Sequence, residues 1–288
     1  MLAHLYVLLP VLDDDKHYWV AEDEVEKLMA RGGTWLGVHP ERDLIVRRYL
    51  RHQKRLATAA FERLLEEDQP DPDKDEETHD REEAVVEERL GLSTQRIGAV
   101  VSVLRSMGAR RVVDLGCGEG TLIRELLADP QFSEVSGVDV SHRALAAAAR
   151  ALHLDRMPER QRDRVKLYQS SLTYRDRRLS GYDAATLLEV VEHVEPSRLA
   201  ALEHSVFGSA QPGSVVVTTP NAEYNVRFET LPAGEMRHRD HRFEWTRAEF
   251  AGWSRSVGER YGYAVRFLPI GPEDPEVGPP TQMAVFTR

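Results

Sequence analysis

The sequence is poor in cysteine and has no long hydrophobic run. Its single cysteine, Cys117, cannot form an internal disulfide, so the sequence gives no sign of an oxidising compartment. The longest apolar run near the start, LAHLYVLLPVL, contains Pro10, is shorter than a bilayer requires and leads directly into three aspartates. We therefore interpret this run as a buried strand, and we expect a cytoplasmic protein with no membrane partner.

Negative charge is concentrated in one segment. The formal net charge of the chain is −10, and residues 66–88, EEDQPDPDKDEETHDREEAVVEE, contribute thirteen acidic side chains against two basic ones. The rest of the chain is nearly neutral, so its overall acidity does not exclude a nucleic-acid partner. A segment this acidic, without large aromatic residues, cannot bury enough surface to fold. The pattern predicts a linker over residues 66–88, either a solvated spacer or an acidic contact for a partner protein.

Residues 1–65 contain the apolar strand and two helical patterns, EDEVEKLMARGG and ERDLIVRRYLRHQKRLATAAFERLLEE. A lone buried strand needs a sheet to join, so these elements do not make a complete core. We expect residues 1–65 to form a small strand and helical segment that continues from a preceding domain.

Residues 89–288 alternate between strand and helix patterns, which predicts a Rossmann-like, doubly wound α/β domain with a parallel sheet and helices on both faces. The last two strand patterns flank a loop rich in proline and glycine and form an antiparallel hairpin, which brings the expected sheet to seven strands. Ligands of such a sheet bind at the carboxyl ends of its strands. The expected strands are RRVVDL, EVSGVDV, VKLYQSS, YDAATLLEV, GSVVVTTP, YAVRFLP and TQMAVFTR.

A glycine-rich turn, DLGCGEG, follows the first of these strands. Its glycines allow a tight turn and the close approach of a ligand to the backbone. The second strand ends in Asp139, which is placed to accept hydrogen bonds from two ribose hydroxyls. Together the turn and Asp139 resemble the S-adenosylmethionine site of class I methyltransferases more than a nicotinamide site. The cofactor residues in the turn are Asp114, Gly116, Gly118 and Gly120.

Carboxylates and imidazoles follow the fourth strand and recur after the fifth. Glu189, Glu192 and His193 stand at i, i+3 and i+4, a spacing that puts them on one face if the chain is helical there. The segment RHRDHRFEW adds His241, with His238 as the rival ligand. Two carboxylates and two imidazoles without a thiolate favour Mn²⁺, with Mg²⁺ or Co²⁺ as alternatives. The other interpretation is a surface cluster of salt bridges.

Seven segments, LSTQR, DLGCGEG, GVD, SSLTYRD, EVVEHV, TTPNAEYN and RHRDHRFEWTRAEF, occur in an order and spacing that resemble the HUA-enhancer family of RNA 3′-terminal ribose 2′-O-methyltransferases. The resemblance is closest to the bacterial members that act in RNA repair, and it covers residues 92–288. It implies an RNA substrate and, in the bacterial members, an RNA ligase and kinase-phosphatase as repair partners. The role in ligase activation belongs to an additional N-terminal domain of those members, so the resemblance does not carry it over to residues 1–65.

The resemblance also implies roles for individual positions. It gives contacts with S-adenosylmethionine to Asp139, Ser171 and Leu172, and contact with the RNA end to Arg96. It favours His241 over His238 and so gives, as the residues that bind the divalent ion and carry catalysis, Glu189, Glu192, His193 and His241.

This ligand set predicts a chemistry. A ribose hydroxyl is a poor nucleophile at neutral pH, and a bound cation lowers the pKa of such a group. The 2′ and 3′ oxygens of a terminal ribose would complete the coordination, so that only an RNA end with a free 2′,3′-diol is methylated. Glu192 or His193 would take the proton. The alternatives are a small-molecule O-methyltransferase and a non-catalytic scaffold in a repair complex.

Two further features have open interpretations. The basic stretch over residues 159–178 fits either contacts with RNA phosphates or a solvated surface. Phe243 and Trp245 fit either stacking on a terminal base or, more commonly for such a pair, packing in the core.

Overall fold

The computed structural model describes residues 90–232 and 234–288, together with Glu87 and isolated positions between residues 28 and 49. By its internal contacts the chain divides into two compact units, Met1–Asp75 and Glu76–Arg288. In the first unit the described residues are almost all helical, and six of them are buried: Leu28, Gly32, Leu36, Ile45, Val46 and Tyr49. The predicted N-terminal strand lies outside the described residues, as does the predicted linker apart from Glu87.

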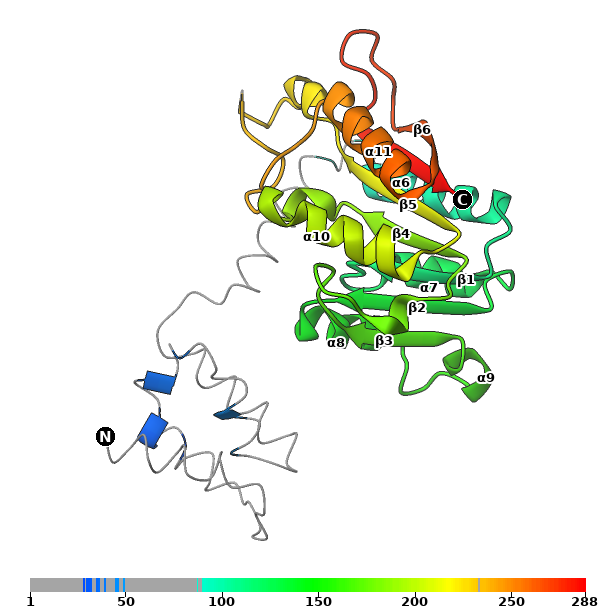
Figure 1. Cartoon of the computed structure of the whole chain (residues 1–288), viewed down its shortest axis with the longest axis vertical. Helices are drawn as coiled ribbons and strands as arrows, with labels where there is room; N and C mark the ends of the chain where they lie inside the picture. The colour runs from blue at the N-terminus through cyan, green and yellow to red at the C-terminus, as the bar shows by residue number, and fades with distance from the viewer. Residues whose placement is uncertain are drawn as a thin grey trace. The chain divides into compact units, whose positions relative to one another are not determined.

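The second unit is built on a seven-stranded sheet in the order β3-β2-β1-β4-β5-β7-β6 (Figure 1). The first five strands are parallel, whereas β7 runs antiparallel to both β5 and β6. This arrangement confirms the predicted class I methyltransferase fold with its antiparallel last pair. The strands are β1 Arg111–Leu115, β2 Glu134–Asp139, β3 Val165–Gln169, β4 Ala184–Leu188, β5 Ser214–Pro220, β6 Ala264–Ile270 and β7 Thr281–Thr287.

Helices cover both faces of the sheet (Figure 1), which explains why the central strands are buried along nearly their whole length. Helices α6 Leu92–Ser106, α7 Thr121–Ala128 and α8 His142–Ala151 pack on one face. The other face is covered by α10 Leu199–Glu203, the π-helical η4 His204–Ala210 and α11 Arg247–Tyr261. Short elements complete the unit: α9 Glu159–Arg162, η1 Arg177–Leu179, η2 Val191–His193, η3 Pro196–Arg198 and η5 Ala222–Arg227.

Helix α11 shows how local sequence sets the boundaries of an element. Thr246 caps its first turn and exchanges hydrogen bonds with Glu249 in a capping box, and Gly262 ends the helix with a φ of 77°. The helix therefore begins immediately after the RHRDHRFEW segment, and its capped first turn fixes the backbone at the end of that segment. No helix among the described residues is long and apolar enough to cross a membrane.

Candidate active site

The glycine turn between β1 and α7 has the backbone that only glycine adopts without strain. Gly116, Gly118 and Gly120 have φ angles of 80°, 48° and 79°. The N–H of Gly118 donates to Oδ2 of Asp139 at 2.9 Å, so the turn is joined to the end of β2. A Cβ at Gly118 would meet no atom within 4 Å, which leaves open space directly above the turn. This is the geometry that a closely approaching cofactor requires.

The ends of β2 and β3 complete this half of the site. Asp139 accepts the N–H of Ser141 with Oδ1 at 2.8 Å, and its backbone carbonyl accepts the N–H of Ser170 at 3.0 Å. Ser171 and Leu172 follow at once, with Oγ of Ser171 3.0 Å from Oγ1 of Thr173. The structure therefore brings the predicted cofactor residues to the carboxyl ends of three adjacent strands.

Asp114, near the end of β1, is buried, with an exposed fraction of 3%. The hydroxyl of Thr186 donates to its Oδ1 at 2.7 Å. Burial, which the nearby charge of Asp139 reinforces, raises the pKa of Asp114 to about 7 despite that hydrogen bond. Asp114 therefore titrates near neutral pH at the base of the glycine turn.

The second half of the site begins at the end of β4. Two glutamates follow β4, and both accept hydrogen bonds from threonines near the end of β5. The Thr218 hydroxyl donates to Oε1 of Glu189 at 2.7 Å, and the Thr219 hydroxyl donates to Oε2 of Glu192 at 3.2 Å. Glu189 has a φ of 51°, in the left-handed region, and a 3₁₀ turn follows at Val191–His193. Glu189 and Glu192 are therefore not arranged on one face of an α-helix, as the spacing suggested, but by a strained turn and two hydroxyls.

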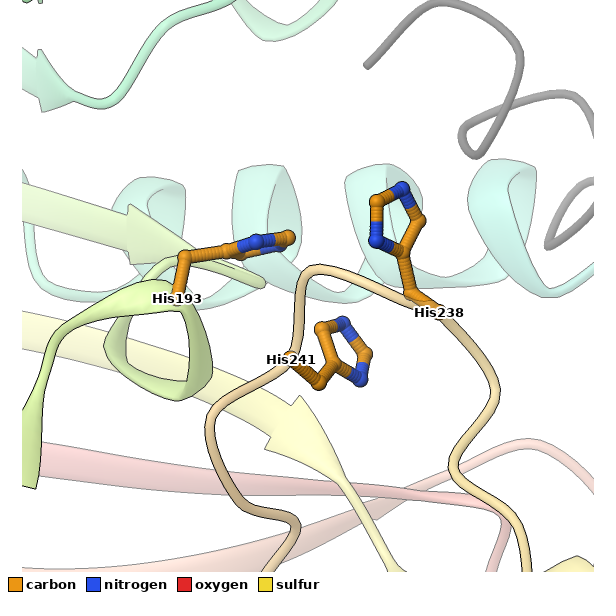
Figure 2. A group of neighbouring side chains, drawn as sticks. All are labelled: His193, His238 and His241. Carbon is orange, nitrogen blue, oxygen red and sulfur yellow. The ribbon is translucent and has the colours of Figure 1, made fainter. Parts of the chain in front are cut away.

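Three imidazoles lie close together at this end of the sheet (Figure 2). His193 belongs to η2, while His238 and His241 belong to the long connection after β5, and both of their rings lie near that of His193. One ligand-type nitrogen from each ring lies within 4.8 Å of the others, and the ring centroids of His193 and His241 are 4.7 Å apart. The N–H of Arg242 donates to the carbonyl of Glu192 at 2.8 Å, which ties the connection to η2. The carboxylates of Glu189 and Glu192 do not belong to this compact group of three.

Hydrogen bonds distinguish His241 from its rival His238. Nδ1 of His241 lies 2.7 Å from Oε1 of Glu244, and an ionised carboxylate only accepts, so Nδ1 carries the proton and in the neutral ring Nε2 has the lone pair. Nδ1 of His238 instead accepts the backbone N–H of Asp240 at 3.0 Å, so in its neutral ring the proton is on Nε2. His241 is therefore oriented as a metal ligand, and His238 is oriented as a donor.

Glu244, the partner of His241, is a buried carboxylate. Burial alone would raise its pKa, but hydrogen bonds from His241 and Asn225 and the charge of Arg237 outweigh this effect and hold the pKa below its ordinary value. The carboxylate therefore stays ionised and orients the imidazole that it contacts.

The site residues fit a divalent cation. Within the described part of the chain, Oε2 of Glu189 and Nε2 of His241 are buried and make no hydrogen bond. Leaving Nε2 of His241 without a partner is costly, whereas Oε2 of Glu189 has an ion pair but no hydrogen bond, and both atoms are good ligands for a hard or borderline cation. Burial raises the pKa of Glu189, which the positive charge of Arg96 opposes, because Nη1 of Arg96 lies 3.3 Å from Oε2 of Glu189. The predicted RNA contact Arg96 is thus beside the predicted metal ligand.

The basic stretch over residues 159–178 is partly committed to the fold. Arg164 donates to the backbone carbonyls of Leu127, Asp129 and Phe132. Lys166 pairs with Glu134, and Arg178 pairs with Asp176. Side chains in such pairs are less available for RNA phosphates, so the exposed arginines of α9 remain the stronger candidates.

The aromatic pair of Phe243 and Trp245 is also partly used in packing. Trp245 packs against Trp253 with ring centroids 5.0 Å apart and contacts the buried core of the α11 face. The ring centroid of Phe243 lies 4.5 Å from that of Trp245, and Phe243 is half-buried.

Two site residues were not singled out from the sequence. Glu244 stands three residues after His241, and this spacing within RHRDHRFEW was the available signal. Glu87 belongs to the acidic stretch, where no local pattern distinguishes it from its neighbours. Yet its exposed fraction is only 4%.

Comparison with known proteins gives two family matches. A model described as "RNA repair, ligase-Pnkp-associating, region of Hen1" matches residues 1–65, and a model described as a methyltransferase domain matches residues 49–263.

Individual relatives agree with these matches. The chain is 36% identical over 213 residues to the small RNA 2′-O-methyltransferase of Mus musculus, covering 72% of this chain and 53% of that protein. It is 34% identical over 214 residues to the protein of the same name in Arabidopsis thaliana, covering 68% and 22%. The solved methyltransferase domain of bacterial CtHen1 is 53% identical with a TM-score of 0.64, covering 69% of this chain and 100% of that one. The chain thus spans about half the length of the mouse relative.

Proposed function

Because the chain belongs to the Hen1 family of methyltransferases, we propose that it transfers the methyl group of S-adenosylmethionine to the 2′-hydroxyl of the 3′-terminal ribose of an RNA. The names of the mouse and Arabidopsis relatives support an RNA 2′-hydroxyl as the acceptor. The observation that carries the proposal is the position of two groups of residues: the glycine turn with Asp139, and the glutamates with the histidines. Both lie at the carboxyl ends of parallel strands, and hence at one edge of the sheet.

The first group suits S-adenosylmethionine. The open space above Gly118 admits the methionine portion, and each oxygen of Asp139 keeps a lone pair beyond its bond to the backbone for a ribose hydroxyl. Asp114, when ionised, adds a negative charge that favours a cationic sulfonium. Ser171 and Leu172 continue the same edge of the sheet.

The second group suits a divalent cation, with Mn²⁺ favoured by the mixed oxygen and nitrogen donors. Glu189, Glu192, His193 and His241 would hold it: His193 and His241 offer nitrogens within 4.8 Å of each other, and Oε2 of Glu189 and Nε2 of His241 are buried without a hydrogen bond. Such a cation supplies Lewis acidity that selects a free 2′,3′-diol and lowers the pKa of the 2′-hydroxyl.

The chain's own side chains position these groups and move the proton. Glu244 fixes the ring of His241, and Thr218 and Thr219 fix the carboxylates of Glu189 and Glu192. Fixed geometry contributes to the rate because it removes the entropy cost of aligning the hydroxyl with the methyl group. Glu192 or His193 takes the proton of the 2′-hydroxyl.

The test compares three RNAs of one sequence that end in a 2′,3′-diol, a 3′-phosphate or a 3′-deoxyribose. With labelled S-adenosylmethionine and Mn²⁺, we expect label only in the diol, and we expect the product end to resist periodate. A chelator should abolish transfer. Equal labelling of the 3′-deoxy RNA, or full activity in the chelator, would contradict end selection through a cation.

The match of residues 1–65 to the ligase-Pnkp-associating model supports a second part of the proposal, in which this region binds an RNA ligase and kinase-phosphatase partner. Such binding would place methylation in RNA repair. The full chain and a chain of residues 66–288 should then differ in co-purification with the partner but not in methyl transfer. Equal co-purification of both chains would contradict this role.

A further inference from the structure

Glu87 is a buried carboxylate at the end of the acidic stretch, and by its contacts it belongs to the second unit. Its Oε1 accepts a hydrogen bond from Nη1 of Arg96 at 2.9 Å, and its Oε2 lies 2.8 Å from the same nitrogen. Nη1 of Arg237, which is 150 residues away in the sequence, donates to Oε1 of Glu87 at 3.2 Å. One carboxylate thus pairs with two guanidinium groups.

The first guanidinium leads directly to the proposed metal site. The same Nη1 of Arg96 that is held by Glu87 lies 3.3 Å from Oε2 of Glu189, which is longer than either of its contacts with Glu87. Arg96 is therefore shared between two carboxylates and is drawn more closely to Glu87. Without the charge of Glu87, the guanidinium would be free to pair fully with Glu189 and would compete with a cation for the same oxygen.

The second guanidinium organises the connection that carries the histidines. The side chain of Arg237 is fully buried and donates to the backbone carbonyls of Asn221 and Pro280. The backbone N–H of Arg237 donates to Oε1 of Glu244 at 2.7 Å. Glu244 in turn orients His241. The charge of Glu87 makes the burial of this arginine tolerable, because an unpaired buried charge is strongly destabilising.

We propose that Glu87 is a positioning residue of the metal site: it draws Arg96 toward itself, which limits the pairing of Arg96 with Glu189, and it stabilises the buried Arg237 that precedes His238. This inference rests on the proposed function, because it assumes that Glu189 and His241 bind a divalent cation. It also gives the end of the acidic stretch a structural role in the methyltransferase domain. The sequence of that stretch gave no reason to expect such a role.

The test measures Mn²⁺ affinity of the full chain by calorimetry, without RNA, for the wild type, Glu87→Gln and a matched control, Glu159→Gln. Glu159 is exposed on α9, so its variant should bind Mn²⁺ like the wild type. Glu87→Gln keeps the shape of the side chain but removes its charge, and we expect Mn²⁺ affinity to fall about tenfold, as for partners that orient metal ligands. Affinity equal to the control would overturn the inference.

A double variant separates positioning from loss of structure. In Glu87→Gln combined with Arg96→Met, the competing guanidinium is gone, so Mn²⁺ affinity should recover toward the wild-type value. Affinity for S-adenosylmethionine, which binds at the other strand ends, should be unchanged in both variants. A double variant as weak as the single one would overturn the role assigned to Arg96, and parallel loss of S-adenosylmethionine binding would overturn the assignment of Glu87 as a positioning residue. Failure of the wild type to bind Mn²⁺ would instead contradict the proposed function.

Discussion

Nδ1 of His241 lies 2.7 Å from Oε1 of Glu244, and both side chains are almost completely buried. This pair fixes the tautomer of the imidazole and directs Nε2, which makes no hydrogen bond with the described residues, away from the carboxylate. Histidines that bind metals commonly have such a carboxylate partner. The neighbouring His238 has the opposite arrangement, with Nδ1 as acceptor.

The two histidines should therefore differ in their effect on metal binding. His241→Ala removes a ligand, and we expect at least a tenfold loss of Mn²⁺ affinity, whereas His238→Ala should cause a much smaller loss. Calorimetric titration with Mn²⁺ measures both, with the melting temperature as the control for folding. The reverse ranking would make His238 the ligand.

Removing the partner of His241 should weaken binding without removing a ligand. Glu244→Gln deletes the charge that holds Nδ1–H, so we expect Mn²⁺ affinity to fall by about tenfold or more. Glu235→Gln, nearby on the same connection but exposed, is the matched control. Equal affinities of the two variants would argue against a positioning role for Glu244.

Alanine substitutions at two glycines of the turn should have different effects, one on stability and the other on cofactor binding. A Cβ at Gly116 would lie 2.6 Å from Cγ2 of Val190, so Gly116→Ala should destabilise the fold by roughly 1–3 kcal/mol. Gly118→Ala meets no atom, and its φ of 48° costs only about 1 kcal/mol, but the methyl group enters the space assigned to the cofactor. We expect Gly118→Ala to lose S-adenosylmethionine binding with little change in melting temperature.

Gly98→Ala, within α6 and with open space around it, is the control: it should leave cofactor affinity unchanged and raise stability by up to about 1 kcal/mol, because alanine favours the helix. Normal cofactor affinity in Gly118→Ala would show that the cofactor does not approach this backbone.

The raised pKa of Asp114 predicts a dependence of stability on pH. Its folded pKa of about 7 lies above the ordinary value of 3.8, so its contribution to stability is fully present below pH 4 and is lost as pH rises through 7. Asp114→Asn keeps an acceptor for Thr186 and cannot ionise. We expect the variant to exceed the wild type only slightly at pH 4 and by on the order of a few kcal/mol at pH 8.

Chemical denaturation at the two pH values measures the difference, with the exposed Asp163→Asn as control. A variant that is less stable than the wild type at pH 8 would mean that the ionised form is preferred in the fold.

The arginines of the basic stretch should separate into structural and RNA-binding groups. Arg164→Ala loses bonds to three backbone carbonyls and should lower stability, with no change in the salt dependence of RNA binding. Arg162→Ala, exposed on α9, should leave stability unchanged and reduce the salt dependence by about one phosphate contact. Fluorescence anisotropy over a range of salt concentrations measures the second effect. Identical salt dependence of all three proteins would exclude this surface from RNA binding.

The sequence by itself determined the architecture of residues 89–288. Seven strand patterns, the glycine turn and the capping residues Thr246 and Gly262 are local signals, since each depends on neighbours within a few positions. The carboxyl ends of adjacent parallel strands must meet at one edge, so the convergence of the cofactor residues with Glu189 and Glu192 also followed from sequence order.

The tertiary structure decided what depends on distant partners. The spacing of Glu189 and Glu192 suggested a helical face, but the hydroxyls of Thr218 and Thr219, which lie on another strand, hold these carboxylates through a non-helical turn. The proton positions on the histidines follow from hydrogen bonds that the pattern of residue types does not contain. The burial of Glu87 against Arg96 and Arg237 is likewise invisible in an acidic stretch, because the pairing of charges depends on where the folded chain places them and not on their order.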